Sequence, residues 1–129
     1  MTKPKIVTLC GSSRFVDVMA VCAWILERDE GAIALSLHLL PWWYPNCPDH
    51  HLAETEGVAV SMDELHLRKI DLADEVFVVN AGHYVGSSTS NEVRYATELG
   101  KPIRWFTEDP IGAQVSAMME AARNAASQR

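Results

Sequence analysis

The chain has 129 residues, of which 48% are hydrophobic and 22% charged, a balance typical of one globular domain and too apolar for a disordered chain. Its 17 acidic and 11 basic residues give a formal charge of −6, which disfavours binding to DNA or RNA polymers, although not to a single nucleotide. No apolar run approaches the ~20 residues of a membrane span, we expect no signal peptide, and three irregularly spaced cysteines favour a reducing compartment, so we expect a cytoplasmic protein.

The expected elements alternate between strand and helix. In chain order they are a strand at 5–10, a helix at 15–28, a strand at 32–40, a helical stretch at 51–72 with a break near Gly57, a strand at 75–80, a helix at 89–99 closed by Gly100, a strand at 102–106 and a helix at 111–126. Three prolines between 41 and 48 exclude a regular element there. Such alternation predicts parallel strands joined by right-handed crossovers, in one doubly wound α/β domain over residues 1–129.

Ligands of such folds lie beyond the carboxyl ends of the strands, where this sequence has three unusual loops. The first is Gly11-Ser12-Ser13-Arg14, which leads into a helix. Backbone N–H groups and the helix dipole attract an anion at such a place, and an arginine adds a charged fork. Ordinary capping of the helix by Ser13 accounts for the same residues, so phosphate binding and capping both stay open.

The second loop, 82–92, is crowded with hydroxyl groups and ends at Glu92. Thr89 and Glu92 fit a capping box, with Thr89 at the N-cap and Glu92 three residues further on, in the first turn. The alternative is chemical, because a carboxylate at the mouth of the sheet can attack the anomeric carbon of a sugar, as the nucleophile of a glycosidase does. Spacing alone favours the cap.

The third loop places three adjacent aromatic residues, Trp42, Trp43 and Tyr44, in a proline-rich segment. Stacking on a nucleobase is one natural use of such side chains, and a lid or a dimer contact is the other. Shortly after them, Cys47, His50 and His51 offer three zinc ligands, but no second Cys/His cluster completes a site. We therefore expect no metal.

Three segments together resemble the nucleoside 2-deoxyribosyltransferase superfamily, and within it most closely the small nucleoside 5′-monophosphate N-hydrolases. They are KIVTLCGSSRF at 5–15, DELHLRKIDLADEVFVVN at 63–80 and GHYVGSSTSNEVRYATELGKPI at 82–103. The resemblance covers roughly residues 5–106. It implies a flavodoxin- or Rossmann-like three-layer sandwich with a mainly parallel sheet of four to five strands, a homodimer that completes its sites across the interface, and cleavage of an N-glycosidic bond without a cofactor.

The resemblance also implies roles for individual residues. Glu92 matches the family's nucleophile, which attacks C1′ before water or a second base resolves the sugar–enzyme intermediate. The family usually carries an aspartate on the preceding helix to orient the substrate or protonate the leaving base; this sequence has His66 there and Asp63 one turn earlier, and either can be the acid. The positions that match the nucleotide- and phosphate-binding loops are Gly11, Ser12, Ser13, Arg14, Gly86, Ser87, Ser88 and Thr89.

These groups predict a metal-independent N-glycosidase that hydrolyses the base–sugar bond of a (deoxy)ribonucleoside 5′-monophosphate, with Trp42, Trp43 and Tyr44 as candidates for binding the base. Base exchange between nucleosides needs the same groups and differs only in the acceptor. A nucleotide-binding sensor without turnover is the alternative from a different class, and His66 in the aspartate position is the best argument for it. A cytokinin-type phosphoribohydrolase opens with a similar turn, but its P-G-G-x-G-T loop is missing here.

Overall fold

The computed structural model describes residues 2–47 and 51–128, and the expected alternation of strands and helices is confirmed there. In chain order the elements are β1 (Ile6–Gly11), η1 (Ser13–Phe15), α1 (Val16–Glu30), β2 (Ile33–Leu35), α2 (Leu52–Thr55), α3 (Ala59–Leu72), β3 (Glu75–Val79), η2 (Ala81–His83), α4 (Ser87–Glu98), β4 (Ile103–Trp105) and α5 (Pro110–Ser127). No helix in these ranges is long and apolar enough to cross a membrane.

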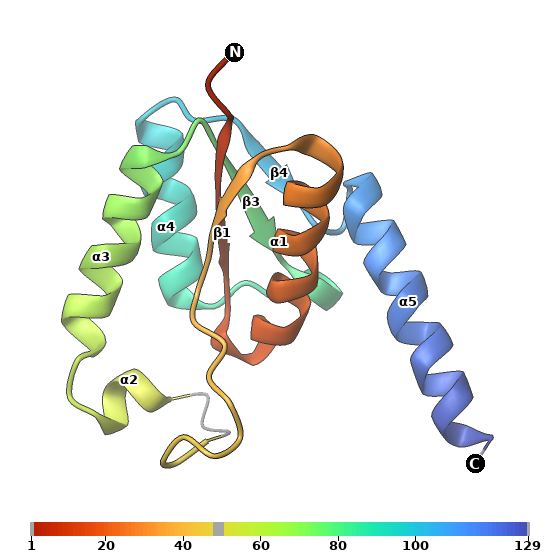
Figure 1. Ribbon diagram of the computed structural model, residues 1–129. Helices are drawn as coiled ribbons and strands as arrows, with labels where there is room; N and C mark the ends of the chain where they lie inside the picture. Colours follow the sequence, from red (N-terminus) through yellow and green to blue (C-terminus); the bar gives the residue numbers. More distant parts are fainter. Residues whose placement is uncertain (1, 48–50, 129) are drawn as a thin grey trace.

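The strands form one parallel sheet of four strands in the order β2-β1-β3-β4. The central pair, β1 and β3, runs in register from Val7 opposite Glu75 to Gly11 opposite Val79. Helices α3 and α4 cover one face of the sheet, and α1 and α5 lie on the other (Figure 1). The chain is therefore a Rossmann- or flavodoxin-like α/β sandwich, as predicted.

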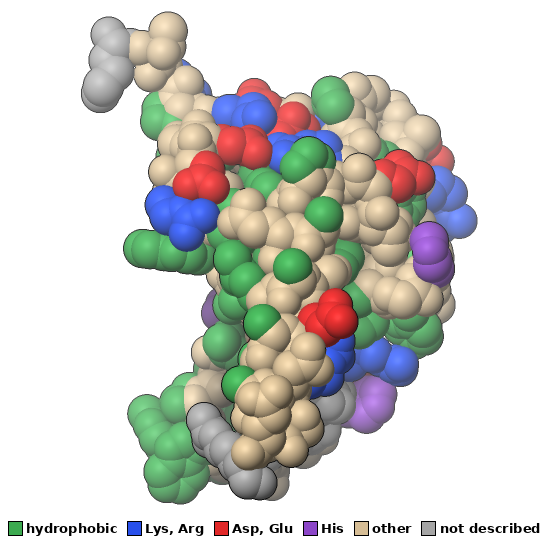
Figure 2. All heavy atoms as spheres, turned by 90° about the vertical axis from the view of Figure 1, so that its right-hand side faces the viewer, with side chains coloured by type: hydrophobic (Ala, Val, Ile, Leu, Met, Phe, Trp, Pro, Cys, Tyr) green, Lys and Arg blue, Asp and Glu red, His purple; other side chains and the backbone are tan. Residues whose placement is uncertain are grey.

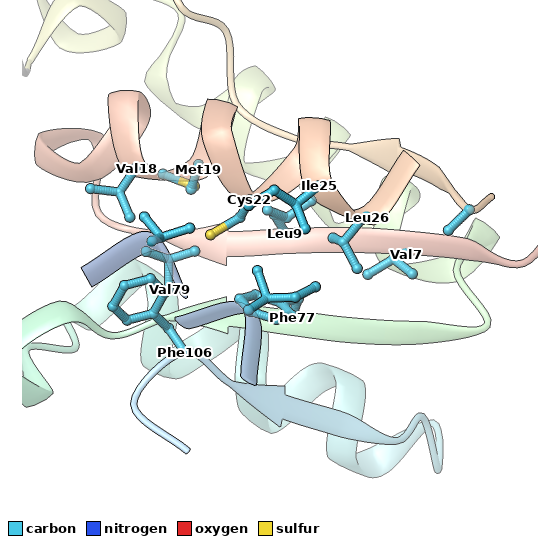
Figure 3. Close-up of a cluster of buried hydrophobic side chains, with 13 residues drawn as sticks. Val7, Leu9, Val18, Met19, Cys22, Ile25, Leu26, Phe77, Val79 and Phe106 are labelled. Carbon is cyan, nitrogen blue, oxygen red and sulfur yellow. The ribbon is translucent and has the colours of Figure 1, made fainter. Parts of the chain in front are cut away.

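The larger of two apolar cores lies between the sheet and the α1–α5 face (Figure 3). Alternate residues of β1 and β3 reach it because successive side chains of a strand point to opposite faces. Each fully buried aliphatic or aromatic side chain contributes roughly 1.5–3 kcal/mol. The core consists of Val7, Leu9, Val18, Met19, Cys22, Ile25, Leu26, Ala32, Phe77, Val79, Phe106, Ile111 and Val115.

The second core lies between the other face of the sheet and the α3–α4 pair. One polar strand residue, Thr8, is buried on this face, where its hydroxyl donates a hydrogen bond of 2.8 Å to the carbonyl oxygen of Lys69. That bond joins β1 to the end of α3. The apolar members of this core are Cys10, Ile70, Val76, Val78 and Ala96.

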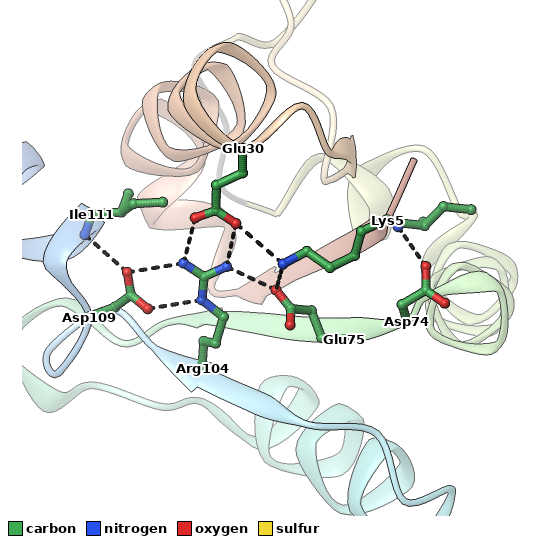
Figure 4. A network of polar contacts seen from close by, with 8 residues as sticks. Lys5, Glu30, Asp74, Glu75, Arg104, Asp109 and Ile111 are labelled. Atoms are coloured by element: carbon green, nitrogen blue, oxygen red, sulfur yellow. Dashed lines mark hydrogen bonds and ion pairs between the residues drawn. The ribbon is translucent and has the colours of Figure 1, made fainter. Parts of the chain in front are cut away.

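A network of charges stabilises the amino-terminal end of the sheet (Figure 4). The guanidinium of Arg104 in β4 donates hydrogen bonds of 2.9 Å to Glu30, Glu75 and Asp109, and Lys5 forms a 3.0 Å ion pair with Glu75. The hydrogen bond from Arg104 lowers the pKa of the Glu30 carboxyl. These contacts connect α1, β3, β4 and the start of α5, and they leave the carboxyl ends of the strands for other chemistry.

Helix α5 approaches the backbone that follows β4 very closely at Gly112. A Cβ atom at this position would overlap the carbonyl oxygen of Phe106, so the two segments fit only because residue 112 has no side chain. Gly112 is buried, and its neighbours Ile111 and Val115 belong to the larger core. This contact anchors the first turns of α5 to the sheet.

One strand is shorter than predicted. The apolar pattern of 32–40 predicts a strand to Leu40, but β2 ends at Leu35, and Leu39 and Leu40 are exposed. β2 is an edge strand that pairs only with β1, and directly after it the carbonyl oxygen of Ser36 accepts a hydrogen bond of 2.8 Å from the Lys69 ammonium. The backbone carbonyl group of Ser36 thus has a hydrogen-bond partner outside the sheet.

Candidate functional site

The candidate site lies at the carboxyl ends of β1 and β3, where two of the three predicted loops meet. In a sheet with this strand order, the connections that leave β1 and β3 diverge to opposite faces, and ligands of such folds bind at that point. The loop after β1 holds Arg14, and the loop after β3 holds Tyr84 and leads into α4. Side chains from α3 and α4 complete the site from the second core.

Glu92 lies in the middle of α4 and points into the protein rather than into solvent. Its side chain is 12% exposed, and its Oε2 atom is buried without a hydrogen-bond partner among the described residues. Burial raises the pKa of the Glu92 carboxyl to about 8, and the negative charge of Asp63 on α3 adds to the effect. Few buried carboxyl oxygens in proteins lack a partner, so this one marks a place where a ligand can supply it.

His66 of α3 and Cys10 of β1 lie beside Glu92. The His66 Nε2 atom is 3.5 Å from the Cys10 sulfur and 3.8 Å from Glu92 Oε2, the second distance being longer than a hydrogen bond. Burial lowers the pKa of His66 to about 4, helped by the positive charge of Lys69, and burial raises the pKa of the Cys10 thiol. At neutral pH the imidazole is therefore uncharged.

The two candidates for the leaving-group acid differ in their surroundings. His66 is buried, and because its imidazole is uncharged at neutral pH it is poorly suited to protonate a leaving base. Asp63 lies one turn earlier on α3 and is exposed, and its charge acts on Glu92. The geometry thus favours Asp63 for contact with a bound molecule and His66 for positioning Glu92.

The loop after β1 is built differently from the capping prediction. Ser12, not Ser13, is the N-cap of η1, with its hydroxyl accepting a 3.3 Å hydrogen bond from the Arg14 N–H. The Arg14 guanidinium donates a 3.2 Å hydrogen bond to the Tyr84 hydroxyl and lies 3.9 Å from the centre of that ring. Gly11 has no room for a side chain, since a Cβ would meet the Val79 carbonyl oxygen at 3.0 Å. The exposed arginine is thereby held between the two loops.

The predicted capping box at the start of α4 is wrong. The helix begins at Ser87, two residues earlier than predicted, and Gly86 is its N-cap, with no side-chain hydrogen bond to the first turn. Thr89 is buried, and Glu92 is the sixth residue of the helix instead of lying in the first turn. The cap therefore does not account for Glu92. The amide groups of the first turn keep their capacity to bind an anion.

The aromatic loop after β2 projects from the molecule. Trp42 is 84% exposed and Trp43 69%, so both pack little against the rest of the described chain, while the Tyr44 hydroxyl donates a 2.8 Å hydrogen bond to Glu56. Figure 2 shows hydrophobic side chains projecting at the lower end of the molecule, the end at which this loop lies in Figure 1. The three possible zinc ligands of the sequence follow this loop. The structure describes Cys47 and His51, whereas His50 lies outside the described residues.

Two further features are the buried Cys10, which was not predicted, and a hollow beside α2 and α3. Cys10 was not among the predicted site residues. It lies two residues after Thr8 in β1, so both side chains point to the face of the sheet that α3 covers. An open hollow of about 700 Å³ lies beside α2 and the start of α3, and neither Glu92 nor His66 lines it. Its lining consists of Glu54, Gly57, Ala59, Val60, Ser61 and Glu64.

Comparison with known proteins finds no matching family model, no matching curated relative and no matching solved structure. The fold and the site therefore define the class: an α/β protein with four parallel strands and a buried Cys–His–Glu cluster at their carboxyl ends.

Proposed function

We propose that the protein is an N-glycosidase that hydrolyses the base–sugar bond of a nucleoside 5′-monophosphate, with Glu92 as the nucleophile. The observation that carries this proposal is the buried Glu92 oxygen, for which the described part of the chain offers no hydrogen-bond partner. A carboxylate in such surroundings is a strong stabiliser of a positively charged transition state, because little water screens its charge. The cationic sugar of N-glycosidic cleavage is a partner of that kind.

The phosphate is assigned to the neighbouring loops. The Arg14 guanidinium, held by Tyr84, supplies a charged donor, and the first turn of α4 supplies backbone N–H groups at Ser87, Ser88 and Thr89. Asp63 is the candidate for contacting and orienting the leaving base, and the exposed Trp42 and Trp43 are candidates for stacking on that base.

The direct test is base release from a panel of ribo- and deoxyribonucleoside 5′-monophosphates and the matching nucleosides, followed by chromatography. We expect release from at least one monophosphate and slower release from the corresponding nucleoside. If a second base in the mixture is incorporated into nucleoside, the activity is base exchange. If a monophosphate binds and no base appears, the protein is a sensor and the proposed hydrolysis is wrong.

Arg14→Ala should separate phosphate binding from sugar chemistry. Loss of a hydrogen bond to a charged group costs about 1.5–3 kcal/mol, so we expect KM for the monophosphate to rise about 10- to 100-fold while KM for the nucleoside changes little. The matched control is Arg28→Ala, which removes an exposed arginine that pairs with Asp29 in the last turn of α1. An equal effect of Arg14→Ala on both substrates would remove the phosphate assignment.

The rate of base release should rise with pH. A nucleophilic Glu92 must be ionised, and with a pKa of about 8 only about a tenth of it is ionised at pH 7. We expect kcat/KM to rise about tenfold between pH 6 and 7 and to level off above pH 8. Of its neighbours, His66 loses its proton well below this range, the buried Cys10 thiol holds its proton above it, and Asp63 adds negative charge. A rate that falls with rising pH would mean that the protonated form of Glu92 is the active one.

We also propose a cytoplasmic homodimer. Helix α3 carries Val60, Met62 and Leu65 at its surface, and α1 carries Trp24, all of them exposed in the single chain. Covering such side chains with a second copy removes apolar surface from water. The three cysteines are free thiols, as a reducing compartment requires. Light scattering at several protein concentrations distinguishes a dimer from a monomer.

A further inference from the structure

Three side chains of the site have the spacing of metal ligands. The Cys10 sulfur, the His66 Nε2 atom and a Glu92 carboxylate oxygen all lie within 4.8 Å of one another, with 3.5 Å between sulfur and nitrogen and 3.8 Å between nitrogen and oxygen. Around tetrahedral zinc, with bonds of about 2.3 Å to sulfur and about 2.0–2.1 Å to nitrogen or oxygen, the ligand atoms lie roughly 3.3–3.6 Å apart. The sulfur–nitrogen distance already fits, and the Glu92 carboxylate must move closer to the other two ligand atoms for all three to bind one ion.

The burial of the cluster is a second observation that points to a ligand. Cys10 is fully buried, His66 is 4% exposed, and the Oε2 atom of Glu92 has no hydrogen-bond partner within residues 2–47 and 51–128. A thiol, an imidazole and a carboxyl group lie together in an apolar core, although each loses favourable contacts with water there. A cation bound between them replaces those contacts.

The chemistry of the three groups selects the ion. Thiolate and imidazole are ligands of zinc and of other borderline or soft metals, whereas calcium and magnesium take sets made of oxygen alone. One thiolate and one carboxylate balance the two positive charges of the ion, while the imidazole stays neutral. Three protein ligands leave the fourth position of a tetrahedron to water, and the negative charge of Asp63 nearby favours entry of a cation.

We propose that Cys10, His66 and Glu92 bind one Zn²⁺ ion through Sγ, Nε2 and a carboxylate oxygen. On binding, the thiol proton and any carboxyl proton pass to solvent, three bonds to zinc form, and no group is oxidised or reduced. The proposal departs from the expectation of no metal, which was based on Cys47, His50 and His51. Because the ion occupies Glu92, bound zinc inhibits base release; this second part rests on the proposed function.

Cobalt provides the test, because a Co²⁺–thiolate bond has a charge-transfer absorption that the metal in water lacks. Chelator-treated protein is titrated with Co²⁺, and zinc affinity is measured by competition with a chromophoric chelator. We expect one equivalent to bind with the thiolate band present in the wild type and in the control Cys47→Ser, and absent in Cys10→Ala. Glu92→Gln and His66→Gln should each weaken zinc binding by at least about tenfold.

A second variant tests the proposal if Cys10→Ala does not fold, as judged by circular dichroism. The chain has three cysteines, so a band that persists in the double variant Cys22→Ala/Cys47→Ser belongs to Cys10. Absence of the band from the wild type, or its loss in Cys47→Ser, overturns the proposal. If the protein binds zinc but its chelator-treated, metal-free form releases base from no substrate, the glycosidase is refuted and the metal site stands. Base release unaffected by zinc at saturation would refute the inhibition alone.

Discussion

Glu92→Gln is expected to abolish base release, by at least about 1,000-fold in kcat, while the protein stays folded. Glutamine matches glutamate in shape but cannot attack C1′ or hold a negative charge beside the forming cation. Because Glu92 does not cap α4, the substitution removes no cap, and replacing a buried carboxyl by a neutral amide should not reduce stability. Kinetics with the best monophosphate of the panel, together with thermal melting, measure both effects.

The matched control for this variant is Glu98→Gln. Glu98 is in the same helix but exposed, so the same chemical change there should alter neither kcat nor the melting temperature appreciably. If Glu92→Gln keeps most of its activity, then Glu92 is not the nucleophile. If it binds a monophosphate as tightly as the wild type and the wild type itself releases no base, the sensor becomes the better description.

Gly112→Ala is expected to destabilise the protein by about 1–3 kcal/mol or more, which is opposite in sign to the usual effect of this change in a helix. Alanine normally stabilises a helix interior relative to glycine by roughly 0.5–1 kcal/mol. Here the added methyl group overlaps the Phe106 carbonyl oxygen, so α5 must move away from the sheet. Each kcal/mol corresponds to roughly 4 °C in Tm for a chain of this size.

The control for the packing effect is Ser116→Ala, which changes an exposed position of the same helix. It should shift stability by no more than about 0.5 kcal/mol. Urea unfolding followed by circular dichroism compares the two variants with the wild type. A Gly112→Ala protein as stable as the wild type would show that α5 does not pack against the backbone after β4 as described.

Much of the fold was predictable because its signals are local. The apolar run of residues 5–10 identifies β1, and the break at Gly57 is confirmed between α2 and α3, where this glycine has a φ of 74° that few other residues adopt. Gly100 closes α4 as predicted, through hydrogen bonds from its own N–H to Thr97 and from the Lys101 N–H to Ala96. Such features depend on a few neighbouring residues.

Two predictions of the fold are wrong because contacts between distant parts of the chain decide the structure there. The apolar pattern after Leu35 is strand-like, but β2 has a neighbour on one side only and Lys69 binds the next carbonyl oxygen. The T-S-N-E sequence at 89–92 also fits a capping box, yet α4 starts earlier, at Ser87, and Thr89 is buried. No local rule shows that α4 starts after Gly86 rather than at the capping pattern three residues later.

The candidate site was predictable only in part, because some of its contacts also join distant parts of the chain. The positions of Glu92, His66 and Arg14 followed from loops and helix spacing, whereas the contact of His66 with Cys10 joins residues 56 positions apart. The sequence therefore indicates the elements that carry the candidate site but not the composition of the buried cluster. The pKa of Glu92 was equally out of reach, because burial sets it and burial depends on the packed structure.

The pairing of β1 with β3 has a consequence for the order in which the molecule is made. The Ile6 N–H reaches the Asp74 carboxylate across 68 positions, so the centre of the sheet can form only after more than half of the chain has left the ribosome. Contacts of such sequence separation slow folding, since a long loop must close before they are gained. During that interval the side of β1 that carries the Cys10 thiol lacks its native cover, and apolar surface exposed in this way promotes aggregation of a nascent chain.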